Sequence, residues 1–273
     1  MSKKDSEHPK LPDILYHYTT ASAFQSIVET AQIWATNVRF LNDTSELNYA
    51  IERAGKLWNQ SPAKHPSEYR KICMVALSVG FNYTYIVSFS EMADDLSQWR
   101  AYARPGGLCI GFSRAALEKS FNDAAEMSGI ERCHYDKKSL DDMLLAKRSE
   151  IDASIASSET VDDRLANDAF DLLLIASSSK NPSFVSEREV RLVFYPDMEE
   201  EKYTMGFHTK NGIVVPHYEI PRVDVGKAPW IKRVVVGPTP NPDGAEWGVR
   251  ELLREHDLSA ADVVSSKIPY RDW

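Results

Sequence analysis

Residues 187–195 read ERE-VRLVFY, a pair of carboxylates that leads directly into a run of β-branched and aromatic residues. Such a composition is typical of a β-strand. Side chains alternate between the two faces of a strand, so Glu187 and Glu189 are predicted to share one face where this strand begins. Two like charges on one face repel each other. Either a solvated strand end or a functional site would explain them.

A second informative stretch, LYHYT at residues 15–19, places a histidine between two tyrosines at the end of a predicted strand. Thr19 or Thr20 is suited to cap the helix that follows, so His17 stands where a strand gives way to a helix. Ribose and phosphate groups can meet helix N-terminal amides at such a junction. The alternative is a histidine whose hydrogen bonds are satisfied within the core.

A third stretch, YIVSFS at residues 85–90, predicts a strand whose two serines share one face. Ser88 and Ser90 would face a cleft, or neighbouring backbone would satisfy their hydroxyls. Further along, Trp99 and Tyr102 are three positions apart and share one side of a predicted helix. They would stack on a ligand ring or pack in the core.

The order of predicted elements is that of an α+β protein. Strands and helices alternate at first, residues 139–178 predict a helical insertion, and β patterns follow from 184 onward, with an Asn-Gly hairpin signal at 211–212. Helices are also predicted over 69–79 and 114–128. No repeat or convincing linker is present. We therefore expect a disordered segment at 1–10 and a single domain over residues 11–273.

Composition excludes several classes of protein. The net charge of -8 over 273 residues argues against broad binding to phosphate backbones, which needs clustered Lys and Arg. Cys73, Cys109 and Cys133 form no CxxC pair, and the seven histidines are scattered, so no disulfide framework and no metal site is predicted. The first residues lack the apolar stretch of a signal peptide, and no 18-residue apolar run is present, so we expect a cytoplasmic protein with no membrane partner.

In their order and strand context, the His-Tyr, Ser-x-Ser and Glu-x-Glu motifs resemble the three-motif signature of ADP-ribosyltransferases. From about residue 13 to the C-terminus, the chain is also similar to a bacterial family catalogued as a domain of unknown function. That similarity rests on Leu15–Thr19, Phe40–Glu46, Ser88–Ser90, Trp99–Ala103, Gly107–Phe112 and Glu187–Arg191. The tyrosine departs from the His-Tyr-Glu class, because Tyr18 adjoins His17 and does not lie on a later strand.

The resemblance implies an ADP-ribosyltransferase-like mixed split sheet with flanking helices. It further implies cleavage of the nicotinamide–ribose bond of NAD, the donor substrate, and transfer of ADP-ribose to an unknown nucleic acid or protein, in a toxin or defence setting. Glu189 would stabilise the oxocarbenium-like cation that develops on the ribose, and Glu187 would serve the acceptor. The implied cofactor-binding residues are His17, Tyr18, Thr19, Ser88, Ser90, Trp99 and Tyr102.

Asn42, Asp43 and Glu46 are candidate substrate-binding residues, although a capping box by itself fully explains Asp43 and Glu46. A dinucleotide fold of the Rossmann type is disfavoured because the glycine spacing is wrong, and no Gly-x-Ser-x-Gly elbow supports a serine hydrolase. Two alternatives stay open: a non-catalytic domain that binds a nucleotide or a partner, and an NAD glycohydrolase. A Glu189 that is paired with Arg191 and buried away from His17 would exclude the enzyme.

Overall fold

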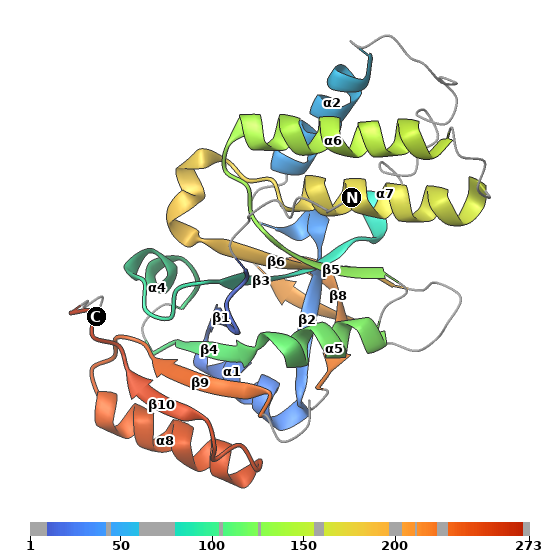
Figure 1. Ribbon diagram of the computed structural model, residues 1–273. Helices are drawn as coiled ribbons and strands as arrows, with labels where there is room; N and C mark the ends of the chain where they lie inside the picture. Colours follow the sequence, from blue (N-terminus) through green and yellow to red (C-terminus); the bar gives the residue numbers. More distant parts are fainter. Residues whose placement is uncertain are drawn as a thin grey trace.

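The computed structural model describes residues 10–41, 45–59, 80–103, 106–124, 127–155, 161–196, 204–210, 212–222 and 229–269. Over these residues the fold is α+β, with a mixed sheet and several flanking helices, as the sequence predicts (Figure 1). Residues 1–9 of the segment predicted to be disordered lie outside the described residues, and so does the helix predicted at 69–79.

The described strands form one sheet of ten. They are β1 (Ile14–Thr19), β2 (Gln32–Asn37), β3 (Tyr85–Ser90), β4 (Leu108–Ser113), β5 (Met127–Arg132), β6 (Glu189–Tyr195), β7 (Met205–Lys210), β8 (Ile213–Pro221), β9 (Ile231–Val236) and β10 (Asp262–Ser265). All pairs are antiparallel except β9 with β10. The main path runs β10-β9-β4-β1-β3-β2-β8-β7, and β6 branches from β3 with β5 beside it.

The sheet is split along one edge of β3. On its other edge β3 pairs with β6 over all six residues, from Tyr85 opposite Phe194 to Ser90 opposite Glu189. On the split edge β2 pairs only with residues 85–86, and β1 pairs only with Ser90. The middle of β3 therefore faces the gap where β1 and β2 part.

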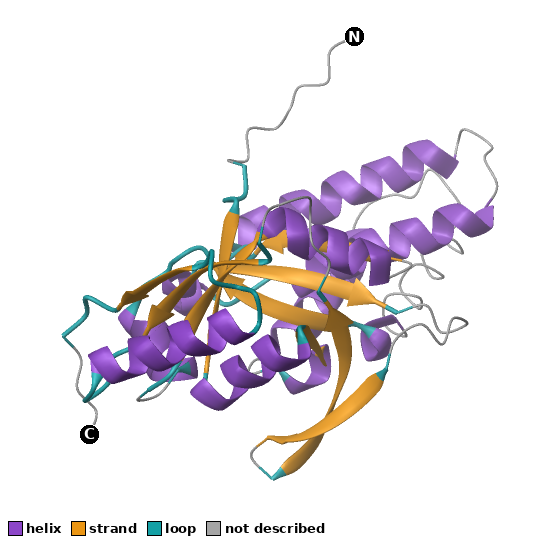
Figure 2. Ribbon diagram, turned by 90° about the horizontal axis from the view of Figure 1, so that it is seen from below, coloured by secondary structure: helices purple, strands orange, loops and turns teal. Residues whose placement is uncertain are grey.

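Helices flank both faces of the sheet (Figure 2). They are α1 (Ala21–Thr30), α2 (Ser45–Asn59), α4 (Leu96–Tyr102), α5 (Arg114–Ala124), α6 (Lys137–Ile155), α7 (Val161–Ser177) and α8 (Pro242–Glu255), with 3₁₀ turns η1 (Val38–Phe40), η2 (Phe81–Tyr83) and η3 (Pro182–Glu187). The main core joins the sheet to α1, α5 and α8. A second core joins its other face to α2, α6 and α7.

Alternation along β3 and β6 explains how one sheet supports two cores. Val87 and Phe89 enter the main core, whereas Ile86 and Val193 enter the second. A third, smaller cluster lies under α4 and contains Tyr18 and Trp99. The predicted helical insertion is the pair α6 and α7, which lies between β5 and β6 in the chain.

One strand differs from the sequence prediction. Residues 114–128 are predicted helical, but α5 ends at Ala124 and β5 begins at Met127. The β5 sequence, MSGIER, holds a glycine and three polar residues, so its strand propensity is weak. All six residues of β5 pair with β6, and this pairing stabilises the strand despite its weak propensity. The Asn-Gly hairpin signal is confirmed by the pairing of β7 with β8.

Two buried thiols, Cys109 and Cys133, are free. Among the described helices, none combines the length and the apolar character that crossing a membrane requires.

The main core should dominate stability. Phe112 is fully buried between Phe89 and Trp230. We expect Phe112→Ala to lower the free energy of unfolding by about 3–5 kcal/mol, because it leaves a cavity. The same change at Phe207, which is 63% exposed, should cost no more than about 0.5 kcal/mol. Urea denaturation measures both, and equal losses would contradict this assignment of the core.

Candidate functional site

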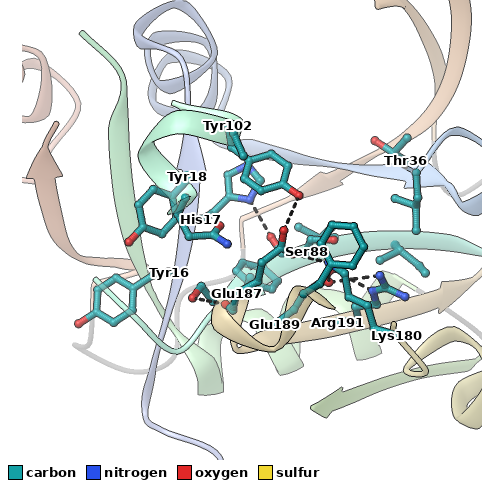
Figure 3. Close-up of a pocket in the computed structure, with 18 of the residues that line it drawn as sticks. Tyr16, His17, Tyr18, Thr36, Ser88, Tyr102, Lys180, Glu187, Glu189 and Arg191 are labelled. Carbon is teal, nitrogen blue, oxygen red and sulfur yellow. Dashed lines mark hydrogen bonds and ion pairs between the residues drawn. The ribbon is translucent and has the colours of Figure 1, made fainter. Parts of the chain in front are cut away.

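A cavity of about 370 Å³ lies at the split of the sheet. Residues of β1, β2 and β3 line it, together with α4, η3, the start of β6 and the end of β7. This volume is at the small end of the range for ligand sites, which is about 300–1,000 Å³. Figure 3 labels ten of the lining residues, from Tyr16 on one side to Thr36 on the other.

The Glu-x-Glu pair reaches this cavity by a different route from the one predicted. Glu187 is the last residue of η3, and β6 begins only at Glu189. Arg188 between them has φ 42°, in the left-handed region that residues with a side chain adopt less readily than glycine does. The prediction that both carboxylates share one face of a strand is therefore wrong. A tight turn brings them together instead.

Lys180 joins the two carboxylates. Its ammonium donates to Glu187 and to Oε2 of Glu189, the latter at 2.6 Å. Arg191 donates from Nε to the other oxygen of Glu189 at 2.9 Å, and from Nη1 to the Ser177 carbonyl at 2.6 Å. The four charged side chains expose only 4–11% of their surface, so this is a buried cluster with no net formal charge.

The cluster fixes the charge state of Glu189. Burial alone would raise the pKa of this carboxyl, but Arg191 and Lys180 outweigh burial and lower the pKa from 4.5 to about 2. Burial likewise lowers the pKa of Lys180, and the two glutamates outweigh burial and raise it overall. At neutral pH the site therefore holds an ionised carboxylate and a protonated amine side by side.

His17 enters the same cavity from β1. Its Nδ1 lies 2.9 Å from the carbonyl oxygen of Ser88, to which only a protonated Nδ1 can donate. Burial lowers the pKa of His17 below its ordinary value of 6.5, and the bond to Ser88 raises the pKa by less. The ring is thus neutral at pH 7. A neutral ring that donates from Nδ1 carries an acceptor at Nε2.

Two further predicted residues lie against Glu187. The Tyr102 hydroxyl donates to Oε1 of Glu187 at 3.2 Å, and a dashed line marks this bond in Figure 3. The Ser90 hydroxyl donates to the backbone carbonyl of Glu187 at 2.8 Å and accepts from the amide of Met92. Tyr102 therefore orients the Glu187 carboxylate. Ser90 links the turn at Glu187 to the end of β3.

The cavity brings together most of the residues predicted for the site. The members that line it are His17, Tyr18, Ser88, Ser90, Tyr102, Glu187 and Glu189. Tyr18 borders the cavity with its hydroxyl already engaged, because that group donates to the Met92 carbonyl and accepts from the Asp95 amide.

The other five predicted residues are not among the residues described as lining the cavity. Thr19 and Trp99 are buried and are not among the described lining residues. Trp99 packs on Tyr18 and donates to Asp94, so it belongs to the core under α4. Asn42 and Asp43 lie outside the described residues. For Glu46 only its place on α2 is described.

Several lining residues have no counterpart among the predictions. Lys180 is the most important of them, followed by Trp34, Phe184 and Lys210. Lys180 follows α7 and precedes an Asn-Pro turn, so its local sequence is that of a solvated lysine. The one signal in the sequence that Lys180 belongs to the site is that it lies only seven residues before Glu187. In the described part of the chain, no group of three or more His, Cys, Asp or Glu could hold a metal ion.

The candidate site is thus a buried ionic cluster beside a cavity, at the split of an α+β protein's sheet. A family model described as "Protein of unknown function (DUF2971)" matches residues 98–192, which span α4 to the middle of β6. No curated protein matches the chain significantly.

Two solved structures are similar to the chain at low identity. One is DarT from Thermus sp. 2.9 in complex with NAD+, with 10% identity and a TM-score of 0.37 over 94% of this chain and 97% of that chain. The other is DarT from Thermus sp. 2.9 in complex with ADP-ribosylated ssDNA, with 11% identity and a TM-score of 0.35 over 94% of each chain.

Glu189 should make stability depend on acid pH. Its folded pKa of about 2 lies below 4.5, so the stability it contributes is complete above pH 4.5 and is lost as pH falls towards 2. We expect Glu189→Gln to be less stable than wild type at pH 7 and to lose less free energy of unfolding between these pH values. Urea denaturation at stepped pH tests this, and parallel pH curves for the two proteins would contradict it.

Lys180 should hold the carboxyl pKa values down. We expect Lys180→Met to raise the pKa of Glu189 by about one unit or more, because an adjacent cation is lost. Side-chain carboxyl ¹³C NMR measures this. Lys147→Met is the matched control, since Lys147 is also mostly buried and paired with carboxylates, Asp168 and Asp171 among them, away from the cavity. A shift of the Glu189 resonance in the control, or none in Lys180→Met, would exclude this role.

Proposed function

We propose that the protein cleaves the nicotinamide–ribose bond of NAD and transfers ADP-ribose to a macromolecular acceptor, a nucleic acid or a protein. One observation carries the proposal: an ionised Glu189 and a neutral His17 line the same cavity at the split of the sheet. The resemblance of the three motifs to those of ADP-ribosyltransferases agrees with it. A bacterial toxin or defence setting would suit such chemistry.

The chemistry needs a fixed negative charge near the ribose. As the bond to nicotinamide breaks, the ribose gains oxocarbenium-like positive charge, which a carboxylate that is already in place can stabilise. Glu189 meets this need because its bonds to Arg191 and Lys180 fix its orientation and keep it ionised. The acceptor nitrogen of a neutral His17 is suited to a ribose hydroxyl, which would orient the sugar.

Glu187 is suited to the acceptor. Its carboxylate is held by the Tyr102 hydroxyl and by Lys180, at the side of the cavity formed by α4 and η3. A carboxylate in this position can accept a proton from an attacking nucleophile. Water as the nucleophile would make the protein an NAD glycohydrolase, so the same geometry serves both reactions.

One observation favours a non-catalytic binding domain instead. Glu189 is paired with both Arg191 and Lys180, so much of its negative charge is already balanced within the protein. This pairing satisfies one half of the condition under which the enzyme would be excluded. The other half is not met, because Glu189 and His17 line one cavity. The enzyme therefore stays the better proposal.

Nicotinamide release from NAD by the purified protein tests the proposal. We expect Glu189→Gln to reduce the rate on the order of 10²–10³-fold, by analogy with loss of a preorganised oxyanion donor. Glu246→Gln is the matched control, since Glu246 is also bonded to an arginine, Arg250, but lies on α8 outside the cavity. This control should keep the wild-type rate. No release by wild type would reject cleavage, and equal rates in all three proteins would reject the role of Glu189.

Product analysis separates transfer from hydrolysis. If water is the acceptor, free ADP-ribose forms in the same amount as nicotinamide without any added macromolecule. A transferase instead retains ADP-ribose on added single-stranded DNA, RNA or protein, which NAD labelled in its adenine ring reveals. Stoichiometric free ADP-ribose in the presence of each acceptor class would reject transfer.

A further inference from the structure

The cavity face of the sheet continues beyond the cavity, across β2, β8 and β7. Residues opposite each other in an antiparallel pair share a face, and so do residues two apart in one strand. Thr36 is opposite His217, and His217 is opposite Gly206. Trp34, His208 and Lys210 therefore lie on the same face as Thr36, and Trp34, Thr36 and Lys210 all line the cavity.

Three rings lie together on this face. The indole of Trp34 lies on the His217 imidazole with centroids 4.0 Å apart and an interplanar angle of 27°. The His208 ring lies 5.3 Å from Trp34, and the two imidazoles meet through their Nδ1 atoms at 3.1 Å. Trp34 still exposes 41% of its surface, whereas His217 is almost fully buried. We name these three residues the ring platform, with Trp34 as its outer plate.

The ring platform carries no charge at neutral pH. Burial and the neighbouring His208 lower the pKa of His217 to about 4, and burial and Lys210 lower the pKa of His208 below 6.5. The charged groups on the same face are Lys210 and Glu219, with Glu219 3.9 Å from Nε2 of His217. An exposed indole held by two neutral rings, with a lysine nearby, is suited to an aromatic ring that carries a phosphate.

The cavity itself limits what its ligand can place inside. Its volume of about 370 Å³ is small for a ligand site, so only part of a dinucleotide would fit between Glu189 and Thr36. The remainder must extend along an adjoining surface. The ring platform is such a surface, because its outer plate and Lys210 already belong to the cavity wall.

We propose that the ring platform is a nucleobase subsite, in which the base of a 5′-phosphorylated adenosine stacks on Trp34 and its phosphate approaches Lys210. The subsite rests on the proposed function only for its ligand in the cell, the adenosine half of NAD. Base stacking on an aromatic side chain contributes about 1–3 kcal/mol, which corresponds to roughly 5- to 150-fold in affinity.

Calorimetry with AMP and with ribose 5-phosphate tests the subsite, because the two probes differ only in the adenine. We expect Trp34→Leu to weaken AMP binding about tenfold or more and to leave ribose 5-phosphate binding unchanged. Trp34→Phe, which keeps a ring, should retain most of the AMP affinity. Unchanged ribose 5-phosphate binding by Trp34→Leu shows that its loss of AMP binding is not due to misfolding. Trp247→Leu is the matched control, since Trp247 is 68% exposed on α8 and does not line the cavity.

Three results would overturn the subsite: no AMP binding by wild type, equal AMP affinity in Trp34→Leu, or equal losses for AMP and ribose 5-phosphate. In the second of these cases, loss of binding to a thymidine oligonucleotide by Trp34→Leu would show that the ring platform serves nucleic acid instead. AMP binding that depends on Trp34, in a protein that releases no nicotinamide, would keep the subsite and reject the cleavage reaction.

Discussion

The pairing of β3 with β6 is the constraint on which the rest of the site depends. It places Ser88 opposite Arg191 and Ser90 opposite Glu189, so each polar residue of one strand meets a charged residue of the other. Since β6 fully occupies one edge of β3, the cavity can form only on the other edge, where β1 and β2 part. The side chain of His17 then reaches across that edge to the Ser88 carbonyl.

Charge balance is the second organising feature. A carboxylate in a buried cavity is costly unless cations or hydrogen-bond donors accompany it. Here Arg191 comes from the same strand as Glu189, whereas Lys180 comes from the segment after α7. The helical insertion thus does more than cover the sheet, because its end delivers the cation that allows Glu187 and Glu189 to lie close together.

The sequence predicts the elements better than their contacts. The strands at 14–18 and 85–90, the α+β class and the hairpin at 211–212 follow from local composition, and the structure has them. β5 could not be foreseen, because its strand state depends on β6, some 60 residues later in the chain. The polar face of β3 follows from simple alternation.

Within the site, long-range contacts set the limit of prediction. Trp99 and Tyr102 share a helix and a spacing, yet Trp99 packs in the core and Tyr102 reaches Glu187. No local pattern separates them, since the position of α4 against β1 and η3 decides which side chain meets the cavity. Lys180 is a similar case, because η3 must turn the chain before Glu187 and Glu189 come within reach of its ammonium.

The backbone of Arg188 has a consequence for the Glu-x-Glu motif. Because Arg188 has a left-handed backbone conformation, the motif forms a turn, and this one residue determines how Glu187 and Glu189 are placed relative to each other. Glycine, asparagine and aspartate tolerate that conformation, whereas valine and isoleucine do not. Related chains that keep the turn are then expected to vary at this position among small and polar residues, and to exclude the β-branched residues that a continuous strand would favour.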